Sequence, residues 1–282
     1  MNGLKQTLHR QTFTMLPGIY DCMSAQAAEQ AGFPALYFSG GAFSMAQLGR
    51  PDMGFFGLTD LLIALQRVLA CVNVPVITDA DNAFGNAIHA ANTAKMLESI
   101  GVAGIQMDDD VLPQEKPGRA KFPLSWELLA PKIRAARQSV SSDFVIILRC
   151  MLAKTDGIDA AIRRANQAVD LGVDYVYFDG ITSESDLEKI ADGCKVGKMI
   201  NLNEQTFSAT LPPEKIQEYG FTVGLYPVSS IQAAAKAYDR LFAHLALTGS
   251  TMPLRENMVM SGELLDRMGM TRLTEQYLPL YQ

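Results

Sequence analysis

Two acidic side chains stand one residue apart where an apolar run of this 282-residue chain ends. The segment is VPVITDADNAFGNA, and its aspartates, Asp79 and Asp81, are followed at once by a turn of small residues. Carboxylates placed in this way can bind a hard cation such as Mg²⁺. A single Asp in a loop is more often a helix N-cap. The pair therefore needs partners from other parts of the chain before it indicates chemistry.

Polar residues close other apolar runs of the chain in the same way. Asp108 closes the fourth run, Arg149 the fifth, and Ser39 with two glycines the second. If these runs are strands of one barrel, their carboxyl ends converge on one mouth, where barrel enzymes have their active sites. Oxygen ligands with almost no histidine suit Mg²⁺, with Mn²⁺ also possible. We therefore expect Asp79, Asp81 and Asp108 to be metal ligands.

The elements that must position these residues alternate regularly along the chain. Short runs rich in Val, Ile, Tyr and Phe are separated by stretches whose apolar residues have helical spacing. Strands that are apolar on both faces and alternate with helices indicate a parallel sheet covered by helices, and eight such units predict a (β/α)8 TIM-type barrel of the α/β class. An open doubly wound sheet is the alternative, but no dinucleotide or Walker-type glycine motif follows a run. The predicted strands are 17–21, 35–40, 74–81, 103–109, 144–150, 174–180, 198–203 and 222–227, and the predicted helices include 87–101, 125–139 and 159–172.

Two features at these strand ends suit a carboxylate substrate. Ser39-Gly40-Gly41 exposes consecutive backbone N–H groups that can hold a carboxylate or a developing oxyanion, although the motif alone is equally a plain turn. Arg149 points into the barrel by its position in its strand. A buried guanidinium needs an acidic partner, which is either a neighbouring Asp or a substrate carboxylate bound through two hydrogen bonds. The sequence leaves both alternatives for Arg149 open.

Composition and charge exclude several classes of protein. With 48% hydrophobic residues the chain can bury a full core, and no linker marks a boundary within 1–282, so we expect a single barrel domain. The net charge of −6, without a Lys/Arg cluster, argues against a nucleic-acid partner. No signal peptide and no membrane-spanning apolar run are evident, so we expect a cytoplasmic protein without a membrane partner. Four cysteines without CxxC spacing argue against a zinc site.

Seven segments carry a resemblance to a known family. In order, they are PGIYDCMSAQAAEQAGFPALYFSGGAFS, LGRPD, DADNAFGN, DDDVLP, ILR, AIRRA and GLYPVSS. Their order and spacing resemble the short branch of the isocitrate lyase/phosphoenolpyruvate mutase superfamily. The resemblance implies a (β/α)8 barrel and a Mg²⁺-held 2-oxo acid or enolate. It also implies a small di- or tricarboxylate or 2-oxo acid as substrate, and a homotetramer or homodimer in which the helical tail at 250–282 is swapped between subunits.

The resemblance further implies roles for single residues. Asp79 and Asp108 match the metal carboxylates, and Asp81 would act directly or through water. Position 108 is usually Glu in the family, so the shorter Asp108 would need a bridging water. Asp52 matches a further active-site carboxylate, and Arg149 matches the arginine that binds the substrate's carboxylate. The implied substrate-binding set is Tyr20, Ser39, Gly40, Gly41, Asp79, Arg149, Asn201 and Glu204.

Departures from the family pattern leave the exact reaction open. The lyases of the family carry a cysteine on the loop after the fourth strand, and Lys116 stands at about that position here. As a catalytic acid or base Lys116 would need a lowered pKa, and otherwise it is a solvated loop lysine. Phe84 replaces a family tyrosine, and Cys150 and Met151 replace a Thr-Asp pair. We take Arg149, Asp52 and Lys116 as the candidate catalytic residues.

Three functions are compatible with these features. The first is a Mg²⁺-dependent carbon–carbon lyase that acts on a small 2-hydroxy or 2-oxo dicarboxylate through a pyruvate-type enolate, in the manner of 2-methylisocitrate lyase or oxaloacetate decarboxylase. The second is an enzyme that breaks the P–C bond of phosphonopyruvate or forms it from phosphoenolpyruvate, as hydrolase or mutase. The third is a non-catalytic metabolite-binding member of the family. Of these, the carbon–carbon lyase is our prediction.

Overall fold

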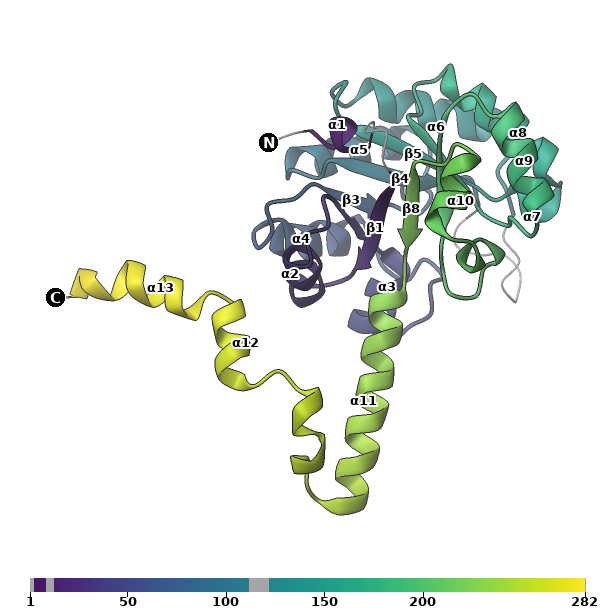
Figure 1. The fold of residues 1–282 in the computed structure, drawn as a ribbon. Coiled ribbons are helices and arrows are strands. Elements are labelled where there is room, and N and C mark those ends of the chain that lie inside the picture. Colours follow the sequence, from purple (N-terminus) through teal and green to yellow (C-terminus); the bar gives the residue numbers. More distant parts are fainter. Residues whose placement is uncertain (1–2, 9–12, 112–121, 282) are drawn as a thin grey trace. The chain divides into compact units, whose positions relative to one another are not determined.

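Eight parallel strands close into a barrel, which confirms the predicted fold (Figure 1). The computed structural model describes residues 3–8, 13–111 and 122–281. Each strand pairs in parallel with the next one along the chain, and β8 returns to pair with β1. Every strand overlaps the run predicted for it. The strands are β1 (Thr14–Ile19), β2 (Leu36–Phe38), β3 (Val76–Asp79), β4 (Gly104–Asp108), β5 (Val145–Cys150), β6 (Tyr175–Phe178), β7 (Gly197–Asn201) and β8 (Val223–Tyr226).

Helices lie between successive strands and cover the outside of the barrel (Figure 1). The helix after β1 begins with a capping box, in which Asp21 Oδ1 accepts the Ser24 N–H at 2.7 Å and Ser24 Oγ accepts the Asp21 N–H at 3.2 Å. The three helices predicted from apolar spacing are present as α5, α6 and α8. The helices of this part are α1 (Leu4–Leu8), α2 (Cys22–Gln30), α3 (Gly40–Phe43), the π-helix η1 (Ser44–Leu48), α4 (Leu58–Leu69), α5 (Ala87–Ser99), α6 (Trp126–Gln138), α7 (Leu152–Thr155), α8 (Ile158–Val169), α9 (Glu184–Gly193), η2 (Phe207–Thr210) and α10 (Pro213–Glu218).

The apolar core has two parts, one inside the barrel and one between the strands and the helices. Along β5, Val145 and Ile147 belong to the inner cluster, whereas Ile146 and Leu148 belong to the outer one. Successive side chains of a strand point to opposite faces, so Arg149 follows Ile147 into the barrel. The same alternation decides which polar residues at the strand ends reach the mouth.

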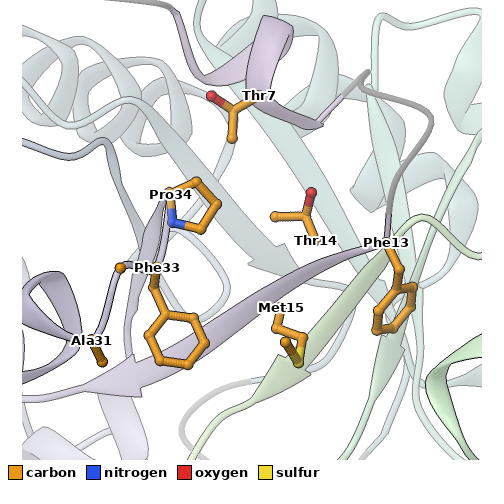
Figure 2. Close-up of a pocket in the computed structure, with 8 residues that line it drawn as sticks. Thr7, Phe13, Thr14, Met15, Ala31, Phe33 and Pro34 are labelled. Carbon is orange, nitrogen blue, oxygen red and sulfur yellow. The ribbon is translucent and has the colours of Figure 1, made fainter.

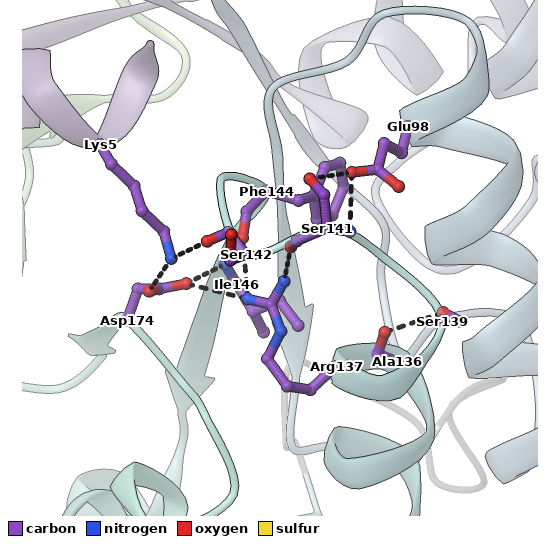
Figure 3. A network of polar contacts seen from close by, with 10 residues as sticks. All are labelled: Lys5, Glu98, Ala136, Arg137, Ser139, Ser141, Ser142, Phe144, Ile146 and Asp174. Carbon is purple, nitrogen blue, oxygen red and sulfur yellow. Dashed lines mark hydrogen bonds and ion pairs between the residues drawn. The ribbon is translucent and has the colours of Figure 1, made fainter.

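The amino end of the barrel is covered by the short helix α1 (Figure 3). Leu4 and Leu8 of this helix are buried in the inner cluster, and the Leu8 carbonyl accepts a hydrogen bond from the Tyr175 hydroxyl at 3.1 Å. Lys5 Nζ lies 2.8 Å from Asp174 Oδ1. The sequence does not predict this helix, because its single turn carries too few apolar residues for a periodic signal.

A network of hydrogen bonds joins neighbouring elements at this same end (Figure 3). Asp174 Oδ2 accepts the Ile146 N–H at 2.8 Å and lies 3.5 Å from Arg137 Nη1. Arg137 also donates to the Phe144 carbonyl at 2.8 Å and to the Ser141 carbonyl. The charges of Lys5, Arg137 and Asp174 therefore have partners within the network.

A pocket of about 310 Å³ lies beside β1, at the turn between α2 and β2 (Figure 2). Among the described residues that line it there is no candidate catalytic or metal-binding residue from the sequence. It is therefore distinct from the candidate site at the mouth. Its lining residues are Thr7, Phe13, Thr14, Met15, Ala31, Gly32, Phe33 and Pro34.

The chain divides into two compact units, residues 1–232 and residues 233–282. The second unit is helical and exposes large apolar side chains, among them Phe242 at 61% and Leu247 at 86% of their surface. A single barrel domain and a tail swapped between subunits stay predictions. No helix within the described residues is long and apolar enough to cross a membrane. The C-terminal elements are α11 (Ser229–Thr248), η3 (Met252–Asn257), α12 (Ser261–Arg267), α13 (Met270–Tyr277) and η4 (Leu278–Tyr281).

Candidate active site

Asp108 and Arg149 lie side by side at the carboxyl end of the barrel. The parallel register pairs Asp108 of β4 with Arg149 of β5 and Asp79 of β3 with Gln106 of β4. Arg149 Nη1 donates to Asp108 Oδ2 at 3.1 Å, and Gln106 Nε2 donates to Asp108 Oδ1 at 3.0 Å. Both carboxylate oxygens of Asp108 thus have a donor. The carboxylate is fixed in orientation at the mouth.

Arg149 is held by a second aspartate on its other side. Its Nη2 donates to Asp179 Oδ2 at 2.7 Å, and its guanidinium lies 5.3 Å above the ring of Tyr177. Lys154 Nζ lies 2.8 Å from the other oxygen of Asp179. Burial raises the pKa of Asp179, but the charges of Arg149 and Lys154 outweigh it and lower the pKa to about 2. Two neighbouring aspartates are thus partners of Arg149, and its binding of a substrate carboxylate stays a prediction.

Asp79 is a buried carboxylate among other carboxylates. Only 5% of its surface is exposed, and its Oδ1 accepts the Asp81 N–H at 3.0 Å. Burial, and then the negative charges of Asp108 and Asp52, raise the pKa of Asp79 to about 7, against the opposing charge of Arg149. The mouth therefore holds more negative than positive charge around this residue.

The two glycines after β2 bring the backbone against these carboxylates. A Cβ on Gly40 would lie 2.9 Å from Phe56 Cζ and 3.2 Å from Asp79 Oδ2. A Cβ on Gly41 would lie 3.1 Å from Asp52 Oδ2. A methyl group at either position would therefore crowd an aspartate of the mouth. Ser39 caps the short helix α3, since its Oγ accepts the Ala42 N–H at 3.2 Å.

Three residues of the loop after β3 have an unusual backbone although none of them is glycine. Asp81, Ala83 and Phe84 have φ angles of 46°, 62° and 56°, in the left-handed region that disfavours side chains. The Asp81 carbonyl accepts the Asp108 N–H at 2.7 Å. The rings of Phe84 and Phe56 pack edge to face, with their centroids 6.1 Å apart. Strain of this kind concentrates at functional sites. The loop couples the strand that carries Asp79 to the strand that carries Asp108.

The donor chemistry fits a hard divalent cation at the mouth. Asp79 and Asp108 are buried, Asp52 is exposed, and the charges of Asp108 and Asp52 both repel that of Asp79, so a bound cation would relieve the repulsion. Within the described residues no three side chains of His, Cys, Asp and Glu converge into a complete metal-binding set. Mg²⁺ needs no such set, because one or two carboxylates, several waters and the substrate are its usual ligands. Asp79, Asp81 and Asp108 stay the predicted ligands.

The other predicted site residues lie in different surroundings. Tyr20 lines a pocket of about 420 Å³ between α2 and α4, together with Phe43 and Ile63. Asn201 ends β7, and its Oδ1 accepts the Asn203 N–H at 2.9 Å. Glu204 is exposed in the loop that follows, close enough to raise the pKa of Tyr226, for which burial is the larger cause. Lys116 lies outside the described residues.

Asp179 and Lys154 belong to the mouth and were absent from the predicted set. Asp179 directly follows β6, whose four residues are all buried, so strand position alone could have found it, whereas Lys154 follows β5 on a short helix without a sequence signal. Asp109, which stands next to Asp108, points outward instead. Its Oδ2 accepts from Arg164 Nη1 at 2.6 Å and its Oδ1 from the Met151 N–H at 2.8 Å.

The sequence of this chain matches a known family over most of its length. The family model described as phosphoenolpyruvate phosphomutase matches residues 4–246. The chain is 30% identical over 275 residues to 2,3-dimethylmalate lyase of Eubacterium barkeri, covering 96% of this chain and 95% of the relative. It is 32% identical over 240 residues to 2-methylisocitrate lyase of Halalkalibacterium halodurans, covering 84% of this chain and 79% of the relative.

The fold comparison agrees with the sequence comparison. A phosphonopyruvate hydrolase, whose structure was solved in complex with oxalate and Mg²⁺, matches with a TM-score of 0.87 at 22% identity and covers 98% of both chains. At 22% identity this similarity supports the fold and not the reaction. The two relatives named above are lyases. The chain therefore belongs to the phosphoenolpyruvate phosphomutase family, within the isocitrate lyase/phosphoenolpyruvate mutase superfamily of lyases and mutases that act on small carboxylates, and it is an enzyme.

Proposed function

We propose that this enzyme is a Mg²⁺-dependent carbon–carbon lyase that cleaves a small 2-hydroxy or 2-oxo dicarboxylate through a pyruvate-type enolate. The observation that carries the proposal is the group formed by Asp79, Asp108 and Arg149 at the mouth of the barrel. It combines an excess of buried negative charge with one fixed guanidinium. An excess of carboxylates favours a dication, and a guanidinium favours a carboxylate substrate.

The metal would be held by the carboxylates of Asp79 and Asp108, with Asp81 bound directly or through a water. When bound, Mg²⁺ would supply positive charge opposite the substrate oxygen that becomes negative as the bond breaks. Mn²⁺ could take the same place, because it also prefers oxygen ligands. Asp52, which acts electrostatically on Asp79, would add to the negative field that retains the cation.

Arg149 would orient the substrate by a charged hydrogen bond to one of its carboxylates. Burial opposes the charge of Arg149, but Asp108 and Asp179 raise the pKa of its guanidinium above the usual value, so it stays protonated. Its two terminal nitrogens are fixed by these aspartates, and its Nε has no hydrogen-bond partner among the described residues. The remaining substrate contacts would come from the backbone of Gly40 and Gly41. Asn201 would add a contact from the side of β7.

The relatives narrow the class of substrate. Two lyases that resemble this chain over most of its length are named for 2,3-dimethylmalate and 2-methylisocitrate. Cleavage of either acid can leave pyruvate. Oxaloacetate stays a further candidate, because loss of CO₂ requires no base to remove a hydroxyl proton. Lys116 stays a proposed acid or base for the lyase direction. The non-catalytic alternative is not pursued, since the relatives found through sequence are enzymes.

The test is a coupled assay of pyruvate release with purified protein and Mg²⁺. The substrates would be 2,3-dimethylmalate, 2-methylisocitrate, oxaloacetate and phosphonopyruvate, each with and without EDTA. We expect turnover of 2,3-dimethylmalate, 2-methylisocitrate or oxaloacetate that is abolished by EDTA and by Asp79→Ala. The matched control is Asp143→Asn, which changes an exposed aspartate at the opposite end of the barrel.

Two outcomes would contradict the proposal. Release of phosphate with pyruvate from phosphonopyruvate, without turnover of any of the other three acids, would assign P–C bond chemistry instead. Turnover of one of those three acids that persists in EDTA-treated protein would show that the reaction needs no metal. Comparison of the products by NMR would separate cleavage of oxaloacetate into pyruvate from other cleavages of the same substrate.

We also propose that residues 250–282 form a tail through which subunits associate into a homotetramer or homodimer. This segment exposes many large apolar side chains, such as Met252 at 66% and Leu280 at 77%. Exposed apolar surface on this scale favours burial against another chain. Analytical ultracentrifugation of the full chain beside a chain ending at residue 249 would test this. A cytoplasmic location stays a prediction.

A further inference from the structure

We propose that Lys132, a buried lysine on α6, is a positioning residue that holds the loop after β3 in the conformation needed by the metal-binding carboxylates. This inference rests on the metal site of the proposed function. Only 4% of the Lys132 surface is exposed, and its Nζ donates a hydrogen bond to the Asn82 carbonyl. Asn82 directly follows Asp81, and it lies three residues after Asp79.

The segment that Lys132 holds is strained. Asp81 and Ala83 flank Asn82, and both have positive φ angles. A non-glycine residue in the left-handed region costs about 1–2 kcal/mol, so the loop would relax toward another backbone path without specific contacts. The Ala83 N–H donates to the Ala80 carbonyl at 2.7 Å, and Thr93 Oγ1 of α5 donates to the Ala83 carbonyl at 3.3 Å. Neither of these two bonds involves the Asn82 carbonyl. Lys132 of α6 donates to that carbonyl and so adds a third contact to the loop.

The choice of lysine at this place is not explained by stability alone. Burial lowers the pKa of Lys132 to about 8, and only the negative charge of Asp110 opposes that shift. A buried ammonium costs more free energy than an apolar side chain of the same length. What the ammonium contributes is a donor for the Asn82 carbonyl together with attraction to Asp110. Lys132 thereby joins the loop after β3 to the residues that follow Asp108.

Both segments that Lys132 joins lie next to proposed metal ligands. Asp81 lies in the loop after β3, and Asp108 ends β4. The Asp81 N–H donates to Asp79 Oδ1, and the Asp108 N–H donates to the Asp81 carbonyl, so a displacement of Asn82 would move this chain of contacts. Replacing a residue that orients metal ligands without touching the metal typically weakens metal binding by about 10–100-fold. We expect replacement of Lys132 to weaken metal binding by a factor in that range, although Lys132 contacts neither metal nor substrate.

The experiment measures Mn²⁺ binding without substrate, from the EPR signal of free Mn²⁺. The variants are Lys132→Met, which keeps the length of the side chain and removes the donor, and Ile133→Ala, which cuts a fully buried side chain of the same helix. Thermal unfolding of each metal-free protein identifies a temperature at which all are folded. At that temperature we expect Lys132→Met to raise the Kd for Mn²⁺ by at least about tenfold. Ile133→Ala should lower the melting temperature and leave the Kd unchanged.

Each outcome has a defined meaning. An unchanged Kd in Lys132→Met, with tight binding by the unmodified protein, overturns the positioning role and leaves the proposed function intact. A Kd that rises equally in Ile133→Ala also overturns it, since general destabilisation would then explain the change. If the unmodified protein binds no Mn²⁺, the proposed metal site fails, and the inference fails with it.

Discussion

The two ends of the barrel treat charged side chains in opposite ways. At the amino end, Lys5 and Arg137 meet Asp174, and the backbone around them bonds to the same side chains (Figure 3). At the carboxyl end, Asp79 lies buried beside other carboxylates, with a pKa raised to about 7 by burial and by Asp108 and Asp52. At the amino end the charges of Lys5, Arg137 and Asp174 are balanced within the chain. At the carboxyl end Asp79 lies beside carboxylates whose charge Arg149 only partly offsets.

The backbone differs between the two ends in the same sense. The helix α1 closes the amino end with leucines that join the inner core. The carboxyl end has three non-glycine residues in the left-handed region between Asp81 and Phe84. Unfavourable features persist where function requires them and where the surrounding fold stabilises them. The difference indicates that the carboxyl end is shaped for a ligand and the amino end for stability.

The largest expected effect tests this difference directly. Asp79→Asn should lower Mg²⁺-dependent turnover by about 10²–10³-fold or more, because charge at the reacting oxygen loses its stabilisation. The metal-free variant should be no less stable than the unmodified protein at pH 8, since a buried charge beside like charges is removed. Urea unfolding and steady-state kinetics measure the two quantities. A loss of stability that matches the loss of turnover would show that Asp79 is a structural residue.

A smaller effect is expected from crowding the carboxylates without changing a charge. In Gly40→Ala the new methyl group would lie 2.9 Å from Phe56 and 3.2 Å from Asp79, so the carboxylate must shift. A misplacement of about 1 Å can cost on the order of 10²-fold in rate, and we expect a loss of about 10–10²-fold. Gly3→Ala is the matched control, because no atom lies within 4 Å of its new methyl group. Equal kinetics in the two variants would contradict the close approach at Gly40.

The fold follows from the sequence because strands buried on both faces leave a strong signal. Each run of Val, Ile, Tyr and Phe became a strand of the barrel, as β5 at Val145–Cys150 illustrates. Periodicity also placed Arg149 inside the barrel. The helix α1 left no comparable signal, because one turn is too short for a period. Its role depends on contacts with distant residues such as Tyr175.

The candidate site was predictable in composition and less so in its contacts. Alternation along β4 separates Asp108, which reaches the mouth, from Asp109, which turns outward to Arg164. The partners of Arg149 depend on the register of three strands, which one sequence does not state. Asp52 reaches Asp79 from a long loop, and Lys132 reaches Asn82 from a helix 50 residues away in the chain. Such contacts are set by tertiary packing.

The pH dependence of stability offers a third test at the carboxyl end. Asp179 has a pKa lowered to about 2, below the unfolded value of 3.8, because Arg149 and Lys154 outweigh its burial. The stability that it contributes is therefore present above pH 4 and is lost as the pH falls toward 2. This corresponds to about 2 kcal/mol.

Asp179→Asn should accordingly lower the free energy of unfolding by about 2 kcal/mol at pH 7, with about half of that difference gone by pH 3. Urea unfolding of both proteins at a series of pH values measures it. Turnover should also fall, because Arg149 loses one of the two aspartates that orient it. A difference in stability that is constant from pH 7 to pH 3 would show that the carboxylate charge of Asp179 contributes nothing.

The smallest effect is expected at the amino end of the barrel, where a charge is removed far from the mouth. Lys5→Met removes the ion pair with Asp174, whose two side chains are 26% and 17% exposed. Pairs of that exposure contribute about 0–1 kcal/mol, and Asp174 keeps its hydrogen bond from the Ile146 N–H. We therefore expect a small loss of stability that shrinks at high salt, with kcat and KM unchanged. Since the mouth lies at the other end of the same strands, a fall in turnover would show that the ends are coupled through the barrel, and the division between a stabilising end and a reactive end would not hold.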